Sequence, residues 1–340
     1  MSLERSKIAL ATTAALLIAF AGLGIQSALD WHGRTYPGFL VLENGVVASV
    51  GLSDWPATRG GEIFQHTVVA VDGAPVTGSA ELRQALRHHT PGSTVELRFS
   101  SNGHEFERPI AMREFNLQDG ALIFGAYLLN GLLLGGIALH LLGRKDLDSR
   151  TTWAATPFLV LGALWGLSAM DLYGPHLLFR AHVFCESLIF AAAVHMAIAF
   201  PTPLLSERLT RRVVAATYGV GALIAVAYQW LLHAPAAYAV IHLLATTLAG
   251  IAMLLVVVAL LNRYLHSSPI DGRASLGVLA GGAVVALVLP VLLTLPELMT
   301  GGTAPQNAVG WTIFLFPATV GYAMRRGTCS SLSAPAASGR

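Results

Sequence analysis

Charged residues are scarce in this chain. Only 12% of its 340 residues are charged, against roughly 25% in a typical soluble domain, while 54% are hydrophobic. This deficit excludes a chain built around a single soluble core and indicates that most of it lies in lipid. The net charge of +2, with no basic patch carrying interleaved aromatics, gives no reason to predict nucleic acid as a partner.

Cysteine and the common catalytic motifs are also nearly absent. Cys185 falls in an apolar run and Cys329 near the C-terminal end, so no disulfide framework is predicted. The sequence has no His-Glu-x-x-His zinc motif, no Gly-x-Ser-x-Gly elbow and no glycine-rich loop that would cradle a phosphate. No catalytic residue, bound metal or cofactor is therefore predicted from motifs.

Long apolar runs dominate instead. A run of about 20 residues crosses roughly 30 Å of hydrocarbon. Eight runs qualify, at residues 8–25, 120–142, 153–172, 177–200, 213–232, 237–261, 274–298 and 308–324. The first follows Arg5 and Lys7 and is interpreted as an uncleaved anchor, because Gln26 fits poorly in a signal-peptidase site. The sequence thus predicts an α-helical polytopic membrane protein with eight transmembrane helices.

Lysine and arginine are distributed unevenly among the loops. They occur before the first predicted span and after the second, fourth, sixth and eighth. The alternate short loops near 171–176, 233–236 and 299–307 contain neither residue. Since positively charged loops stay in the cytoplasm, both termini are predicted to be cytoplasmic, and the segment between the first two spans is predicted to be external.

That external segment has a different composition. Its stretches VVASVG, TVVAVDGAPV and STVELRFSSNGHEFERPI alternate apolar and polar residues between turns, which predicts short strands. GSAELRQALRHHT predicts a short helix with Ser79 as its N-cap. The predicted organisation is an anchor at 1–28, an external domain at 29–118, a seven-helix membrane domain at 119–326 and a disordered cytoplasmic tail at 327–340.

The order of elements in the external domain resembles a PDZ domain, of the type found in bacterial periplasmic proteases of the high-temperature-requirement class. EIFQHTVVAVDGAPV is similar to that family's strand–turn–strand motif, without its usual Gly-Asp, and TPGSTVELRFSSNGHEF is similar to its later helix-to-hairpin motif. The resemblance implies β-augmentation, in which an extended peptide joins a sheet edge and backbone N–H groups hold its terminal carboxylate.

The same resemblance implies a carboxylate loop at YPGFLV, with N–H groups from Gly38 and Phe39 and the Phe39 ring as the pocket floor. Pro37 departs from the pattern because it has no N–H. The helix at Glu81–His88 would form the other wall. The predicted peptide contacts are Tyr36, Gly38, Phe39, Leu40, Val41, Leu82 and Leu86. The alternative is that Tyr36 and Phe39 pack in the domain's core or at its junction with the membrane.

The arrangement of one span, an external PDZ-like domain and seven further spans also resembles the input region of bacterial competence-type quorum-sensing histidine kinases. HMAIAFPTP and FPATVGYAMRRG are similar to short motifs of that region. Only Gly327 to Arg340 follow the last predicted span, so we expect no phosphoacceptor helix or ATP-binding domain. The resemblance implies signalling output through a partner, or a detached input half.

Ionisable residues inside membrane spans are costly and often functional. Five of them gather toward the predicted external side, at Arg180, His182, Glu186, His242 and Glu297. His182 and Glu186 are four residues apart and share a helix face. One interpretation is a ligand or metal pocket, with His182, Glu186 and His242 as the candidate ligands. The other is a structural network in which Arg180 pairs with Glu186 or Glu297.

These features predict a non-enzymatic sensor or scaffold in the inner membrane of a bacterium. It would bind an external peptide or small ligand through the PDZ-like domain or the outer pocket, and helix shifts would pass the signal to a cytoplasmic partner. The predicted partners are a peptide or protein C-terminus, the lipid bilayer and a cytoplasmic histidine kinase or other signalling protein. A membrane-embedded metal-dependent hydrolase and an assembly factor for exported C-termini are the alternatives.

Overall fold

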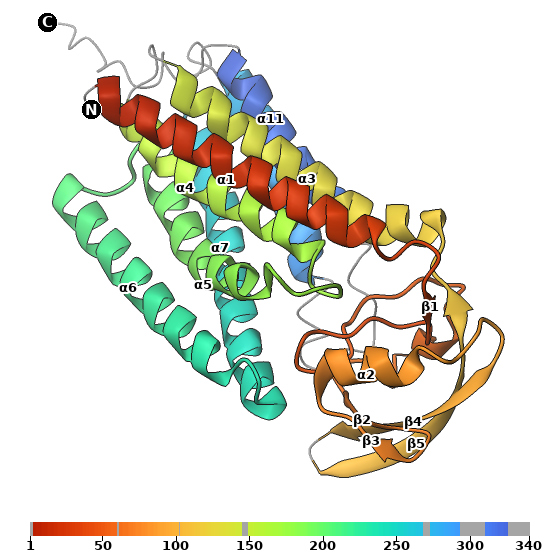
Figure 1. Ribbon diagram of the computed structural model, residues 1–340. Helices are drawn as coiled ribbons and strands as arrows, with labels where there is room; N and C mark the ends of the chain where they lie inside the picture. Colours follow the sequence, from red (N-terminus) through yellow and green to blue (C-terminus); the bar gives the residue numbers. More distant parts are fainter. Residues whose placement is uncertain are drawn as a thin grey trace, which may run out of the picture.

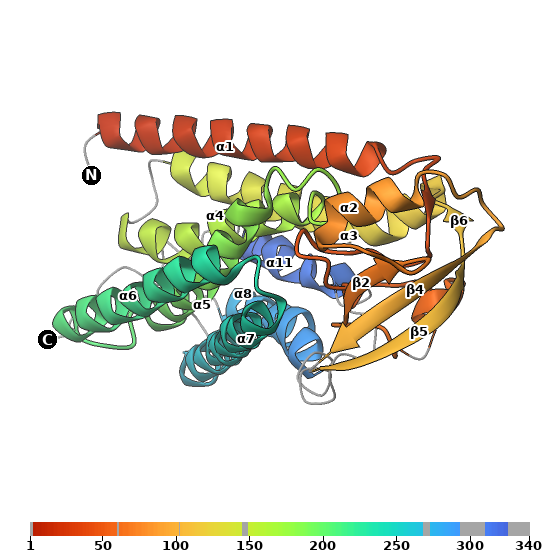
Figure 2. The same ribbon diagram turned by 60° about the horizontal axis from the view of Figure 1, so that its bottom comes forward.

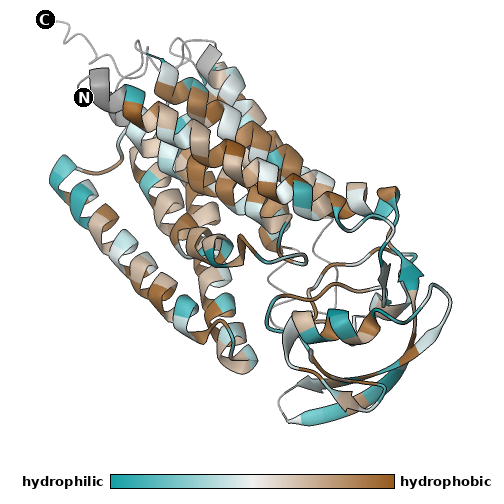
Figure 3. Cartoon of the chain, viewed as in Figure 1, coloured by the Kyte–Doolittle hydropathy of each residue, from teal (hydrophilic) through white to brown (hydrophobic). Residues whose placement is uncertain are grey.

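A bundle of long helices carries a small module of strands at one end (Figure 1). The structure is a computed structural model that describes residues 3–59, 61–101, 103–144, 149–267, 273–292 and 310–325. One long helix precedes the module and all the others follow it. Apolar residues are concentrated on the bundle, whereas hydrophilic residues are frequent on the module (Figure 3).

Among the residues that the structure describes, seven helices are long and apolar enough to cross a membrane. They are α1 (Leu3–Leu29), α3 (Leu117–Gly143), α4 (Ser149–Ala169), α5 (Phe179–Ala199), α6 (Glu207–Leu231), α7 (Pro235–His266) and α8 (Arg273–Ala283). The last continues through the π-helical turn η2 (Val284–Val288), so that the helical span reaches Leu292. The first seven predicted spans are therefore confirmed as long apolar helices, as expected of a polytopic membrane protein.

The eighth predicted span is covered by two short helices. These are α10 (Gly310–Ile313) and α11 (Leu315–Arg325), separated by a turn at Phe314. Their described residues are too few to cross a membrane alone, so a total of eight spans stays a prediction. The predicted tail at 327–340 lies outside the described residues.

Small residues allow the helices to approach closely. A Cβ atom at Gly131 of α3 would collide with Leu167 of α4, and one at Gly135 would collide with Leu17 of α1. Glycine at these two positions therefore permits the close packing of α3 against α4 and α1.

A capping box sets the boundary between the module and α3. The Asn116 side chain accepts a hydrogen bond from the Asp119 N–H at 2.9 Å, and the Asp119 carboxylate accepts one from the Asn116 N–H at 3.1 Å. Two N–H groups at the helix start are satisfied in this way. The same carboxylate accepts a hydrogen bond from the Trp55 indole at 3.1 Å, so the helix cap is also a contact between module and bundle.

The module (residues 30–116) contains two antiparallel sheets. The larger has the order β3-β2-β4-β5, formed by β2 (Thr67–Val71), β3 (Ala74–Pro75), β4 (Thr94–Ser101) and β5 (His104–Ala111). The smaller pairs β1 (Thr35–Tyr36) with β6 (Arg113–Glu114). The short helix η1 (Pro56–Thr58) and α2 (Gly78–Leu86) complete the module. Figure 1 shows α2 on the side of the larger sheet that faces the bundle.

The sequence predicted this module unevenly. The two later strand regions are confirmed, with a turn at Asp72 and Gly73, which have φ of 46° and 78°. The stretch VVASVG is not a regular strand, since only Val46 and Val47 in it form isolated bridges. The N-cap of α2 is Thr77 rather than Ser79.

Candidate functional site

Residues 36–42 lie between two hydrophobic cores. Phe39 and Val41 point into the core of the module, where they belong to one buried cluster with Leu82 and Leu86 of α2. The ring of Phe39 also lies 5.8 Å from that of Phe99 on β4. Four of the predicted peptide-contact residues are therefore brought together, as packed core side chains.

The alternate side chains of the same segment point the other way. Tyr36, Leu40 and Leu42 belong to a second core that continues into the helix bundle. Tyr36 packs edge-on against Trp55 and Phe115, with ring centroids 5.3 and 5.4 Å apart. Burial raises the pKa of the Tyr36 phenol above its ordinary value, so the group is neutral. The side chains of the segment thus alternate between the module core and the bundle core.

One edge of this segment is paired along a tight turn. The Leu40 carbonyl accepts a hydrogen bond from the Ala48 N–H at 2.9 Å, and the Leu42 N–H donates to the Val46 carbonyl at 2.9 Å. These bonds flank an isolated bridge between Val41 and Val47. In this pattern the main-chain groups of Val41 face away from the paired strand.

The unpaired edge of the segment carries the Val41 N–H, whereas the Leu40 N–H lies on the paired edge, on the side of the carbonyl that bonds to Ala48. The N–H groups of Gly38, Phe39, Leu40 and Val41 donate no hydrogen bond to any residue that the structure describes. Gly38 has a φ of 72°, a conformation in which glycine is strongly favoured. Buried N–H groups without acceptors are rare in native proteins, so the unpaired edge is a candidate site for an acceptor such as a carboxylate.

The seven predicted peptide contacts therefore divide into two groups. All seven residues are buried, and Tyr36 and Leu40 face the bundle rather than α2. The alternative prediction, that Tyr36 packs at the junction and Phe39 in the core, describes these side chains better than an open pocket with a Phe39 floor. What remains available for binding is the main chain of the segment.

Helix α2 holds the module to the connector between α4 and α5. Arg83 donates a hydrogen bond to the Gly174 carbonyl at 2.6 Å and another to His176 Nε2 at 3.2 Å. The Ser79 hydroxyl lies 2.7 Å from the same nitrogen. Because a guanidinium can only donate, Nε2 is the acceptor, and the serine hydroxyl donates to it as well. Ser79 is thus a docking residue and not the predicted N-cap.

The N-cap role belongs to an earlier residue for a local reason. The Glu81 carboxylate accepts hydrogen bonds from the Thr77 N–H at 2.6 Å and the Thr77 hydroxyl at 2.8 Å. These bonds lower the pKa of Glu81, because they stabilise its charged form. The helix therefore begins at Gly78, whose φ is 82°, and the Ser79 side chain is free to reach the bundle.

Two further contacts anchor the module at other points of the bundle. Asn44 donates a hydrogen bond to the Leu232 carbonyl at 3.1 Å, at the end of α6. Trp55 reaches Asp119 at the start of α3, as described above. The module is therefore held at α3, at the α4–α5 connector and at α6. In the turned view the module again lies against this end of the bundle (Figure 2).

The His176 contact predicts a pH-dependent attachment of the module. Burial, and then the charge of Arg83, lower the pKa of His176 from 6.5 to about 4. A released His176 would bind a proton already below pH 6.5, so its contribution to stability is complete above that pH and is lost as the pH falls toward 4. We expect proteolysis of the module to accelerate over this window.

Site-directed variants should show whether His176 is the group responsible for that pH dependence. His176→Gln keeps an acceptor for Arg83 but removes the titrating group, so its proteolysis profile should be flatter than that of the wild type. His88→Gln alters an exposed histidine of the module and should leave the profile unchanged. An unchanged profile in His176→Gln would contradict the assignment.

A second polar cluster lies inside the bundle, where α5, α6 and α7 meet. Glu186 Oε1 lies 2.8 Å from His242 Nδ1 and accepts hydrogen bonds from the Tyr228 hydroxyl at 3.3 Å and the Thr246 hydroxyl at 3.4 Å. Tyr228 also lies 2.9 Å from His242 Nδ1. One buried carboxylate thus joins side chains of three helices.

Aromatic rings close this cluster. Tyr238 stacks on the His242 ring, with an interplanar angle of 6° and centroids 5.7 Å apart. Its ring also lies 5.6 Å from that of Tyr228. The Tyr228 side chain is fully buried. The cluster can hold a proton between carboxylate and imidazole, and it ties the helices together.

Within the described residues, His182 forms no hydrogen bond with this cluster. Its Nδ1 lies 3.1 Å from both the Ser168 hydroxyl and the Trp165 carbonyl on α4. Its ring stacks on Trp165 with centroids 5.3 Å apart. His182 shares a helix face with Glu186, but its ring nitrogen bonds to α4 while the carboxylate bonds to α6 and α7.

The predicted pairing of Arg180 with Glu186 is wrong. Arg180 donates a hydrogen bond to Gln229 Oε1 at 3.0 Å and lies 3.2 Å from His233 Nε2. Six residues along a helix amount to about 600° of rotation, which places Arg180 and Glu186 roughly 120° apart around the axis. Glu297, the other predicted partner, lies outside the described residues.

The metal interpretation gains no support from the geometry. Within the described ranges, no three His, Cys, Asp or Glu side chains come together in a way that could hold a metal ion. Tyr228, Thr246 and Tyr238, which complete the cluster, were not foreseen from the sequence. They are identified only by their proximity to Glu186 and His242 in the packed helices, and no local sequence motif indicates that proximity.

Comparison with known proteins gives no relative for this chain. It matches no family model, and no curated protein or solved structure is significantly similar to it. The functional proposal therefore depends on the geometry of the site.

Proposed function

We propose that this protein is a non-enzymatic membrane sensor whose module binds the C-terminus of a peptide or protein. The observation that carries the proposal is the set of unpartnered N–H groups at Gly38–Val41, on a segment whose side chains enter both the module core and the bundle core. A carboxylate bound there would therefore alter the packing of both cores.

The ligand class follows from the chemistry of this edge. Backbone N–H groups near a glycine of positive φ can donate hydrogen bonds to a carboxylate, and an extended main chain can add beside them as a further strand. The element order of the module, which resembles a PDZ domain, supports the same mode of binding. The buried state of the segment means that a peptide must displace its covering side chains, which links binding to movement.

The route to the bundle supports a sensor over a simple scaffold. Helix α2, the other wall of the proposed groove, holds the α4–α5 connector through Arg83 and Ser79. The connector leads directly into α5, which carries Glu186. A shift of α2 would therefore move the end of α5, and small shifts of packed helices are a common way to transmit a signal.

We further propose that the module lies outside a bacterial inner membrane and that both termini are cytoplasmic. The support is the restriction of Lys and Arg to alternate loops. Output would then pass to a cytoplasmic partner, such as a histidine kinase.

Peptide binding in oriented membrane vesicles tests these proposals together. Peptides from a random C-terminal library should bind to right-side-out vesicles at least about tenfold more tightly than their C-terminal amides, because a charge-assisted hydrogen bond contributes about 1.5–3 kcal/mol. Gly38→Val should abolish this preference, since an L side chain is strained at a φ of 72°.

A matched glycine supplies the control. Gly92 has a φ of 88° and open space around a Cβ atom, so Gly92→Val introduces similar strain away from the segment. It should retain binding. Equal affinity for acids and amides would refute the carboxylate site, whereas binding only to inside-out vesicles would overturn the orientation.

A further inference from the structure

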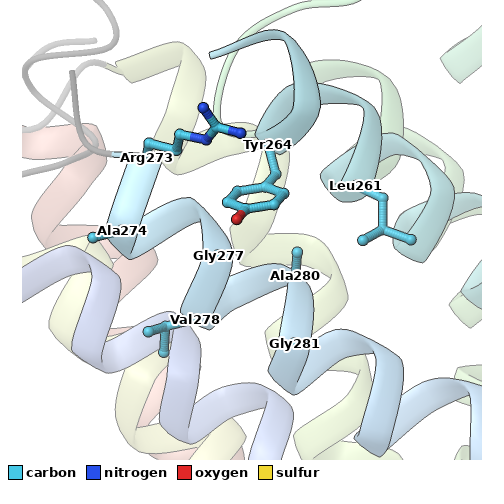
Figure 4. A pocket seen from close by; sticks show the side chains of 8 residues that line it. All are labelled: Leu261, Tyr264, Arg273, Ala274, Gly277, Val278, Ala280 and Gly281. Atoms are coloured by element: carbon cyan, nitrogen blue, oxygen red, sulfur yellow. The ribbon is translucent and has the colours of Figure 1, made fainter. Parts of the chain in front are cut away.

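A groove opens between the last turns of α7 and the first turns of α8. It is an open groove of about 700 Å³, lined mainly by small and apolar residues, with Tyr264 and Arg273 at one end (Figure 4). The module contacts the bundle at Leu232, where α6 ends and α7 is about to begin. The groove is at the other end of α7 and therefore lies away from the module.

Two glycines of α8 line the groove, one covered by the Tyr264 ring and the other open. A Cβ atom at Gly277 would lie 3.1 Å from the Tyr264 ring, whereas one at Gly281 would meet nothing within 4 Å. Leu261 of α7 and Val278 of α8 also line it. The open space at Gly281 between these apolar neighbours suits a hydrocarbon chain, which needs no hydrogen-bonding partner.

Among the described residues, no acidic side chain compensates the positive charge at the end of the groove, and Asp271 of the connecting segment lies outside them. The Arg273 guanidinium lies over the Tyr264 ring, 5.2 Å from its centroid, and it forms no ion pair with any described residue. The sequences of α7 and α8 contain no Asp or Glu. The nearby Arg263 is also not neutralised there, since it donates to the backbone carbonyls of Thr202 and Ala259.

From this combination we infer that the groove binds an anionic phospholipid. Its phosphate would pair with Arg273, beside an aromatic ring of the kind favoured at the membrane–water boundary, and one acyl chain would lie over the open surface at Gly281. The charge of the groove selects an anionic headgroup, and its apolar length selects a lipid over a free phosphate. This inference does not depend on peptide binding by the module.

Native mass spectrometry of the full chain can test the site. The protein would be released from nanodiscs that contain equal amounts of phosphatidylglycerol and phosphatidylcholine. We expect preferential retention of phosphatidylglycerol, reduced about fivefold in Arg273→Gln, since one basic side chain near an anionic headgroup has an effect of about this size. Gly281→Leu, which fills open space, should reduce retention of both lipids.

The control is a cation at the same end of the bundle but outside the groove. Arg208 on α6 is exposed, and Arg208→Gln removes the same charge, so it should retain phosphatidylglycerol like the wild type. Equal retention of both lipids by the wild type, or equal loss in Arg208→Gln and Arg273→Gln, would overturn the proposal and indicate only general attraction to an anionic bilayer. Thermal melting of each variant in phosphatidylcholine alone identifies any loss caused by misfolding.

Discussion

Replacing Glu186 by alanine is expected to destabilise the purified protein by about 3–5 kcal/mol, the usual cost of removing one partner from a buried ionic pair. The change leaves the His242 ring and the Tyr228 hydroxyl without the carboxylate that they share. Both groups lie where α6 and α7 meet α5, so their contacts hold three helices at once. Reversible unfolding in mixed micelles would measure the loss.

Three variants separate the pair from other effects of the substitution. Glu186→Gln keeps an acceptor of similar shape and should cost less than Glu186→Ala. Glu207→Ala removes an exposed carboxylate that pairs with Arg211 four residues later, and such surface changes usually stay within about 0.5 kcal/mol. The double variant Glu186→Ala, His242→Ala should cost less than the sum of the two single changes. Additive costs would show that the two residues do not act as a pair.

Replacing Trp55 by alanine should cost about 3–5 kcal/mol, as expected for loss of a large core side chain. Trp55 is fully buried, and its ring packs against Tyr36 and Phe115. It is also the donor to Asp119 in the cap of α3. The substitution therefore opens a cavity in the core that the module shares with the bundle, and we expect the module to become sensitive to trypsin before the helices unfold.

Two tryptophan variants serve as comparisons. Trp55→Phe retains an aromatic ring but loses the indole N–H, and it should cost about 1–3 kcal/mol because the Asp119 carboxylate loses a buried donor. Trp230→Ala removes a side chain that is 84% exposed, and its effect on trypsin sensitivity should be small. If Trp55→Ala behaved like Trp230→Ala, the shared core would not be what fixes the module to the bundle.

These two experiments address different parts of the proposed signalling route. The Trp55 variant loosens the attachment of the whole module, whereas the Glu186 variant loosens the helices that would respond. If the sensor proposal is correct, Trp55→Ala should weaken transmission while peptides still bind at the Gly38–Val41 edge. That separation of binding from response would not be expected of a passive scaffold.

Much of the fold could be predicted from the sequence because its signals are local. A run of about 20 apolar residues is a property of one segment, and it predicts a membrane-crossing helix without reference to any other part of the chain. The same holds for the hairpin of β4 and β5, in which alternation and a turn at Gly103 suffice. The strand predicted at VVASVG is wrong, because this stretch forms only isolated bridges and no regular ladder.

The candidate site was only partly predictable. The sequence singled out the main chain around Gly38 and the carboxylate of Glu186, since a glycine before alternating apolar residues and a charge inside an apolar run are both local signals. It left open whether Phe39 lines a pocket or packs in the core, and one of its interpretations paired Arg180 with Glu186 or Glu297. In the structure, Phe39 is buried against Phe99, and Arg180 donates a hydrogen bond to Gln229.

By itself, the sequence determined that this chain is a set of long apolar helices with one strand-rich module after the first, because hydropathy and period are fixed by neighbouring residues. Only the tertiary structure decided that Ser79 meets His176, that Glu186 meets His242, and that Tyr36 and Phe39 enter different cores. Such contacts depend on how separate elements pack against one another, and a pattern within one element carries no record of that packing.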